Sequence, residues 1–180
     1  MSKITPFLWF DNQAEEAMNF YVSLFDNSKI ISVNRYPEGA PVPAGTVMSA
    51  TFELDGQTIM VLNGGPMYTL NESFSFYVDC EDQAEVDKFW NALTGNGGEE
   101  GMCGWLKDKF GLSWQIIPSA LGQMLGDPDP DKSRRAMEAM LKMKKIDVPS
   151  LQKAAIGYPI RQTPVSNRSL FILHKLLHPD

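Results

Sequence analysis

The side chains that could do covalent or acid–base chemistry are scarce in most of this chain. Both histidines, His174 and His178, lie in the last seven residues, so no imidazole is available in the preceding 173 positions. Glu53 could act as a general base if desolvation raised its pKa. Cys103 could act as a nucleophile if Lys107 lowered its pKa. Without a histidine partner, a solvated strand-end glutamate and a buried structural cysteine are the simpler interpretations, and no Ser/His/Asp arrangement is present.

The elements that would position such residues occur twice. In residues 4–11 a strand ends in aspartate and is followed by a helix over 14–21 that carries an aromatic pair. The same pattern returns in residues 73–79 and 83–90. Asp11 matches Asp79 with a shift of 68 positions, and Phe20 matches Phe89 with a shift of 69. We interpret this self-similarity as a duplicated supersecondary unit.

Each copy is expected to form a strand, a helix and then three more strands, which gives an α+β fold of two fused βαβββ units. Alternating apolar residues and the Asp55-Gly56 turn signal predict a hairpin over 48–62 in the first unit. We place unit one at residues 3–66, unit two at 72–118, and C-terminal helices at 119–155. The tail, 156–180, has no counterpart in the repeat; a partner-binding segment and sequence foreign to the domain both remain open.

Alternation along the strands also predicts which face of each sheet could bind a ligand. Leu8, Phe10, Phe76 and Val78 are apolar in both copies and should pack beneath the helices, so their neighbours point to the opposite face. Ala50, Phe52 and Leu54 follow the same rule in the third strand. The residues left on the opposite face are Thr5, Phe7, Trp9, Ser49, Thr51, Glu53, Ser73, Ser75, Tyr77, Gln115 and Ile117.

Charge and composition exclude some partners. Sixteen basic and 22 acidic residues give a net charge of -6, which argues against binding to nucleic acid or to an anionic membrane. The two cysteines lack CxxC spacing, and the amino terminus lacks a basic segment followed by an apolar run. No run of about 20 apolar residues could span a bilayer. We therefore expect a cytoplasmic protein.

The repeated pattern and the run from Cys103 to Pro118, CGWLKDKFGLSWQIIP, resemble the PhnB-like branch of the vicinal oxygen chelate superfamily. This superfamily includes glyoxalase I, bleomycin-resistance proteins and extradiol dioxygenases, and the resemblance covers residues 3–155. It implies that each unit curls into a half-barrel cup, that the chain forms a homodimer, and that catalytic members hold a divalent metal in the cup. The branch is often labelled 3-demethylubiquinone 3-methyltransferase.

The metal that the resemblance implies can be tested against named positions. Those that best match the metal ligands of the superfamily are Thr5, Ser49, Ser73 and Gln115, whose neutral oxygens and amide are poor ligands for Zn²⁺, Ni²⁺ or Fe²⁺. His174 and His178 have i, i+4 spacing, but an ordinary amphipathic segment explains them more simply. We therefore expect no metal ligands and no cofactor, with a divalent metal as the less favoured alternative.

The methyltransferase label has little support from the sequence. Methyl donors are usually held by a glycine-rich turn between a parallel strand and the following helix. The only glycine cluster of that kind, Gly95-Asn96-Gly97-Gly98, follows a predicted helix and precedes a predicted strand. This order is the reverse of a donor-binding loop.

The function that fits best is binding of a small organic molecule in the cup. Aromatic side chains would supply apolar surface, and hydroxyl and amide groups would orient polar atoms. An enzyme of the superfamily, a lyase, isomerase or dioxygenase that uses a metal or metal-independent acid–base chemistry, is the first alternative. A structural or interaction protein is the second. The expected ligand-binding residues are Thr5, Phe7, Trp9, Ser49, Thr51, Ser73, Ser75, Tyr77, Trp105 and Gln115.

Overall fold

The computed structural model describes residues 3–157, which divide into two compact units. The first unit runs to Phe74 and also includes Phe110–Leu112. The second contains Ser75–Lys109 and the residues from Ser113 onward. The tail beyond residue 157, with His174 and His178, lies outside the described residues, so the predictions made for it stay predictions.

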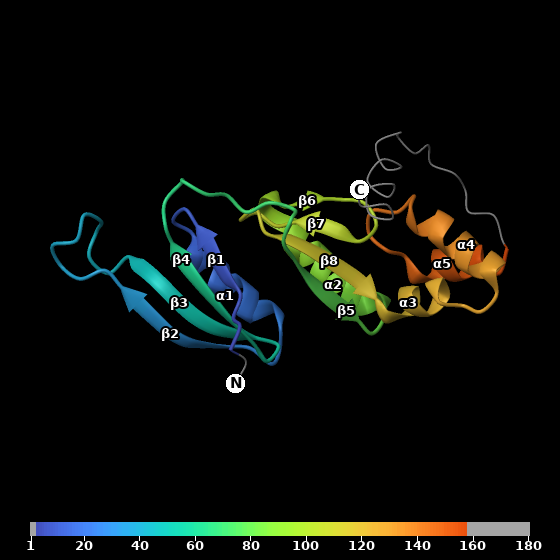
Figure 1. The fold of residues 1–180 in the computed structure, drawn as a ribbon, viewed down its shortest axis with the longest axis horizontal. Coiled ribbons are helices and arrows are strands. Elements are labelled where there is room, and N and C mark those ends of the chain that lie inside the picture. Colours follow the sequence, from blue (N-terminus) through green and yellow to red (C-terminus); the bar gives the residue numbers. More distant parts are fainter. Residues whose placement is uncertain (1–2, 158–180) are drawn as a thin grey trace. The chain divides into compact units, whose positions relative to one another are not determined.

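The first unit is a four-stranded sheet covered by one helix (Figure 1). Its strands are β1 (Phe7–Phe10), β2 (Lys29–Arg35), β3 (Val47–Leu54) and β4 (Gln57–Asn63), and its helix is α1 (Ala14–Leu24). The spatial order is β1-β4-β3-β2, with β1 parallel to β4 and the other pairs antiparallel.

The second unit repeats this arrangement. Its sheet has the order β5-β8-β7-β6, with β5 parallel to β8. The elements are β5 (Ser75–Cys80), α2 (Gln83–Thr94), the 3-10 turn η1 (Gly95–Gly97), β6 (Glu99–Glu100), β7 (Trp105–Lys107) and β8 (Ser113–Pro118). The predicted α+β class and the two βαβββ units are therefore confirmed.

The core of each unit lies between the helix and one face of the sheet. On β3, Ala50, Phe52 and Leu54 are buried, as the alternation predicts. The facing side of α1 buries Ala17 and Tyr21. We call the opposite face of each sheet, turned away from its helix, the cup face.

The hairpin between β3 and β4 turns on Asp55 and Gly56. Their φ angles are 45° and 80°, and two consecutive positive values are the mark of a type I′ turn. This confirms the hairpin that the Asp-Gly dipeptide predicts.

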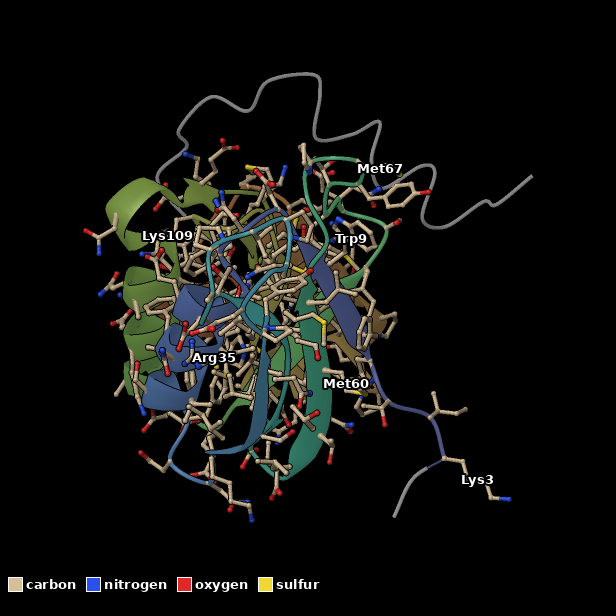
Figure 2. The ribbon with its side chains drawn as sticks, turned by 90° about the vertical axis from the view of Figure 1, so that its left-hand side faces the viewer. Lys3, Trp9, Arg35, Met60, Met67 and Lys109 are labelled. Carbon is tan, nitrogen blue, oxygen red and sulfur yellow. The ribbon has the colours of Figure 1, made fainter. Side chains whose placement is uncertain are left out.

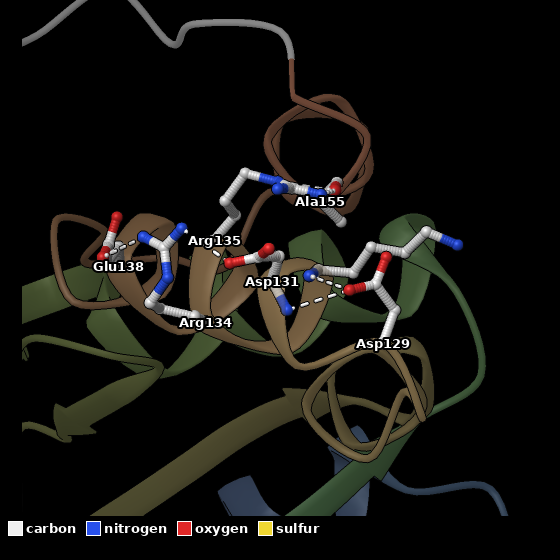
Figure 3. A network of polar contacts seen from close by, with 7 residues as sticks. Asp129, Asp131, Arg134, Arg135, Glu138 and Ala155 are labelled. Carbon is white, nitrogen blue, oxygen red and sulfur yellow. Dashed lines mark hydrogen bonds and ion pairs between the residues drawn. The ribbon is translucent and has the colours of Figure 1, made fainter.

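The C-terminal helices α3 (Ser119–Leu125), α4 (Pro130–Met140) and α5 (Val148–Ala155) belong to the second unit. Asp129 caps α4 through its side-chain oxygen, which accepts from the Asp131 amide over 2.9 Å. The Arg135 guanidinium donates twice to the Ala155 carbonyl at the end of α5, over 2.7 and 2.9 Å (Figure 3). Asp129 is the N-cap residue, and Pro130 follows it in the first turn.

These helices bury an apolar cluster of their own. Met140 is buried in it, and Met137 and Leu141 pack against it. Ile117 of β8, which alternation assigns to the cup face together with Gln115, is a buried member of the same cluster. The helices therefore cover the cup face of the second sheet at the Ile117 end.

The edge strand of the first sheet, β2, is irregular. Its pairing with β3 shifts register between Ile30 and Ser32 and again between Asn34 and Arg35. Such shifts are β-bulges, which bend and twist a strand. None of the helices between residues 3 and 157 is long and apolar enough to cross a bilayer.

Candidate functional site

Three predicted ligand-binding residues stand side by side on the cup face of the second sheet. Gln115 of β8 is paired with Tyr77 of β5 on one side and with Trp105 of β7 on the other. Neighbouring strands are about 4.8 Å apart, so the two aromatic residues flank the amide at about 10 Å from each other. Tyr77 is exposed and Trp105 is half-buried. We call this set the Gln115 row.

The Gln115 side chain is fixed by a fourth predicted residue. Its Nε2 donates a hydrogen bond of 2.9 Å to the Ser75 Oγ. This orients the carboxamide, and among the described residues nothing donates to its Oε1. Partial burial, and then the charges of Asp79 and Cys80, raise the pKa of Tyr77, which keeps its phenol a hydrogen-bond donor at neutral pH.

The indole of Trp105 differs from the other three in the chain. Trp9 donates to the Gly65 carbonyl over 2.9 Å, Trp90 to Glu100 over 3.0 Å and Trp114 to Asp108 over 2.9 Å. The Trp105 indole N–H has no partner among the described residues. Because buried or half-buried indole N–H groups usually find an acceptor, this donor is available to a ligand.

A second polar row lies next to the Gln115 row and was missing from the sequence-based site. Ser113 of β8 pairs with Ser75 on one side and with Lys107 on the other. Ser113 is 1% exposed, and in the described part of the chain its Oγ has no hydrogen-bond partner. Glu99 lies beyond Lys107 at the sheet edge. The signal for Ser113 was present in the sequence, two positions before Gln115 on the same strand face.

The corresponding face of the first unit is more apolar. Trp9 is paired with Leu62, which is paired with Ser49, and the adjacent row contains Phe7, Met60 and Thr51. These six residues, four of which are predicted ligand-binding residues, share one face, and Phe7 and Met60 are exposed to solvent. Figure 2 labels Met60 and Trp9. The Ser49 hydroxyl accepts from the Asn34 amide over 3.2 Å.

Trp9 is held by the loop that follows β4. Besides the bond to Gly65, its ring packs edge-on against Tyr68 with centroids 5.1 Å apart. A Cβ at Gly64 would lie 2.2 Å from the Trp9 ring, so only glycine permits this contact. The Trp9 indole is therefore committed to the fold of its own unit, near the loop that carries Met67 (Figure 2).

Two other predicted residues lie outside the strands. Thr5 is half-buried and precedes β1. Ser73 is exposed and precedes β5, and its amide and hydroxyl both donate to the Asn71 Oδ1. Ser73 is thus not part of the strand face that holds Ser75 and Tyr77.

The two candidate catalytic residues have surroundings that favour structural roles. The Glu53 carboxylate pairs with Lys29 over 3.3 Å at the strand end. Cys103 packs against the apolar cluster of the C-terminal helices, and burial raises the pKa of its thiol, which disfavours the thiolate. This direction is opposite to the lowering of the pKa by Lys107 that a nucleophilic role of Cys103 requires.

A metal site requires clustered ligating side chains, and a methyl-donor loop requires glycines between a strand and the following helix. Within residues 3–157, no three His, Cys, Asp or Glu side chains gather closely enough to hold a metal ion. The glycine cluster 95–98 connects α2 to β6, the helix-to-strand order that the sequence predicts. The strand-to-helix connections, Asp11–Gln13 and Glu81–Asp82, contain no glycine.

Comparison with known proteins gives a consistent family. Residues 2–117 match the family model described as 3-demethylubiquinone-9 3-methyltransferase. The solved structure of a PhnB protein from Bacillus cereus is 42% identical, with a TM-score of 0.61, and 66% of this chain covers 100% of that chain. A protein from Pseudomonas aeruginosa is 21% identical, with a TM-score of 0.54, and the match covers 66% of this chain and 98% of that chain, which shows the shared fold. Among proteins with curated functions, none matches this sequence significantly.

Proposed function

This chain belongs to the 3-demethylubiquinone-9 3-methyltransferase family, the PhnB-like branch of the vicinal oxygen chelate superfamily, and we propose that it binds a small planar organic molecule on the cup face of its second unit. The observation that carries the proposal is the indole N–H of Trp105, which has no partner within residues 3–157, beside the oriented amide of Gln115. Small-molecule sites combine apolar walls with a few fixed polar groups in this manner.

The polar groups define the chemical class of the ligand. Trp105 and Tyr77 offer an N–H and an O–H donor, whereas the Gln115 Oε1 offers an acceptor. A ligand with a planar ring and at least one acceptor oxygen would stack between the aromatic side chains and accept from these donors. Aromatic carboxylates and conjugated carbonyl compounds fit this description.

Binding without methyl transfer is part of the proposal. The strand-to-helix connections lack the glycines that allow a backbone to approach a donor cofactor closely. We also propose binding without a metal, because the residues at the ligand positions of the superfamily, Thr5, Ser49, Ser73 and Gln115, are neutral.

Native mass spectrometry of the purified chain tests these proposals together. We expect the mass of a homodimer, with a retained organic molecule and no stoichiometric divalent metal. A metal bound at one per chain, also after deletion of residues 158–180, would refute the metal-free proposal.

A titration with benzoate locates the site. Benzoate carries a planar ring and two acceptor oxygens, and the indole ¹H–¹⁵N signals report each tryptophan separately. We expect the Trp105 signal, assigned by its loss in Trp105→Phe, to shift with benzoate. The signals of Trp9, Trp90 and Trp114, whose N–H groups are bonded internally, serve as controls and should stay in place. A shift of Trp9 without Trp105 would move the site to the first unit.

A further inference from the structure

The C-terminal helices lie beyond the residues that the family model matches. The family model ends at residue 117, and the full length of the Bacillus cereus protein is covered by 66% of this chain. The helices α3 to α5 occupy residues 119–155. Their contacts with the rest of the second unit indicate which part of that unit they hold in place.

The turn that leads into Trp105 has an unusual backbone. Residues Met102–Trp105 close with a hydrogen bond of 3.1 Å from the Trp105 amide to the Met102 carbonyl. The two central residues, Cys103 and Gly104, have φ angles of 58° and 84°. Two positive values make this a type I′ turn, and a cysteine, with its Cβ, is disfavoured in the left-handed region. The turn therefore needs support from its surroundings.

That support comes from the loop between α4 and α5, residues 141–147, which we call the clamp loop. The Cys103 amide donates to the Met143 carbonyl, and the Gly104 amide donates to the Lys144 carbonyl, each over 2.7 Å. Both central N–H groups of the turn are thus bound by successive carbonyls of the clamp loop.

Side-chain packing also holds the turn in position. A Cβ at Gly104 would lie 2.5 Å from the Ile117 Cδ1 and 3.2 Å from the Ile146 Cγ1. Ile146, in the clamp loop, is fully buried. The turn is consequently pressed between β8 and the clamp loop with no room for a side chain at Gly104.

The clamp loop is itself anchored to α2 through Gln83. The Gln83 Nε2 donates to the Ile146 carbonyl over 3.1 Å, and its Oε1 accepts from the Val148 amide over 2.8 Å. Two further ion pairs join the clamp loop to β6 and to α2: Lys144 with Glu100, and Lys145 with Asp87. One amide side chain thus binds both sides of the peptide segment that ends the loop.

We infer that the clamp loop is a positioning element for ligand binding, which holds the Met102–Trp105 turn so that the Trp105 indole lies beside Gln115. Trp105 is the residue that ends the turn, so its backbone direction is set by Cys103 and Gly104. The same helices bury Ile117 and so close the binding face beyond the Gln115 row. The ligand part of this inference rests on the proposed function, and the positioning part stands alone.

The variant Gln83→Leu in the full chain tests the inference, because it removes both hydrogen bonds to the clamp loop. We expect the Trp105 indole ¹H–¹⁵N signal to move and the affinity for benzoate to fall about fivefold to tenfold, which corresponds to about 1–1.4 kcal/mol. The Trp9 signal should stay in place. Gln57→Leu is the matched control, because Gln57 bonds only to the neighbouring Thr58 carbonyl and is exposed.

Gln83→Glu and Ile146→Val complete the experiment. Gln83→Glu replaces the Nε2 donor with an oxygen that faces the Ile146 carbonyl and the Asp87 carboxylate, which Nε2 contacts over 3.1 and 3.2 Å, so the Trp105 signal should move in this variant as well. Ile146→Val shortens the side chain at Gly104 without touching Gln83 and should move the same signal in a chain that retains its fold. An unchanged Trp105 signal in Gln83→Leu and Ile146→Val would overturn the inference. A shifted Trp105 signal in a chain that never binds benzoate would leave the positioning role standing and count against the proposed function.

Discussion

The Gln115 side-chain amide donates a hydrogen bond of 2.9 Å to the hydroxyl of Ser75, which lies 40 positions earlier in the sequence. The two residues belong to β8 and β5, the parallel strands at one side of the second sheet. The bond uses one amide hydrogen, and nothing among the described residues donates to the Gln115 Oε1. Ser75 thus supports the site by orienting a neighbour.

Removing this hydroxyl should weaken binding without unfolding the chain. In Ser75→Ala the Gln115 carboxamide loses its fixed orientation, and we expect the dissociation constant for benzoate to rise about fivefold, as for one lost hydrogen bond. Ser49→Ala is the matched control, because Ser49 occupies the cup face of the first sheet and accepts from Asn34. Isothermal titration calorimetry measures both variants. Equal losses in the two variants would contradict a site confined to the second unit.

The close contact between Gly64 and Trp9 predicts that alanine at position 64 lowers the stability of the chain, whereas alanine at position 122 does not. Gly64→Ala places a Cβ 2.2 Å from the Trp9 ring, so the ring must move and its bond to Gly65 is lost. We expect the free energy of unfolding to fall by about 2 kcal/mol, as for overpacking of a close contact.

Gly122→Ala serves as the control for Gly64→Ala. Nothing lies within 4 Å of a Cβ at Gly122, which is in α3, and alanine is favoured over glycine in a helix. Urea denaturation should show this variant to be as stable as the parent or more stable. A Gly64→Ala chain as stable as Gly122→Ala would mean that the Trp9 ring is not held as described.

The buried thiol of Cys80 predicts a dependence of stability on pH. Burial, followed by the charges of Glu85, Asp79 and Asp82, raises its pKa from 9.0 to about 12. Because the folded-state pKa is the higher one, the contribution to stability is complete below pH 9 and is lost as the pH rises from 9 toward 12. We expect the stability difference between the parent chain and Cys80→Ala to shrink by about 1–2 kcal/mol between pH 8 and pH 10.5. Urea denaturation at both pH values measures it, and a difference that does not vary with pH would contradict the assignment.

Local patterns were enough to predict the fold. Alternation on β3 identifies Ala50, Phe52 and Leu54 as core, because side chains of a strand point to opposite faces in turn. Asp55-Gly56 predicts the hairpin, because both positions need positive φ. Asp129 before Pro130 predicts a helix start, because that carboxylate satisfies free amides of the first turn.

The site was only partly predictable, because its details depend on contacts distant in sequence. Gln115, Ser75 and Tyr77 follow from alternation and Trp105 from its aromatic side chain, and the structure places all four together on one sheet face. The burial of Ile117 does not follow, because it depends on where the C-terminal helices pack. The commitment of the Trp9 indole to Gly65 also depends on the path of a loop. The strand of the second unit begins at Ser75, because the Asn71 side chain draws Ser73 into a turn.

The two shifts of register in β2 have a consequence for behaviour at high concentration. β2 is the edge strand of the first sheet, and a long regular edge offers unpaired amides and carbonyls to the strand of another molecule. Bulges at Ile31 and beside Arg35 break that row, and Lys29 and Arg35 add charge at its two ends. The exposed Ile30 and Ile31 therefore lie on an edge that is poorly shaped for aggregation by strand addition.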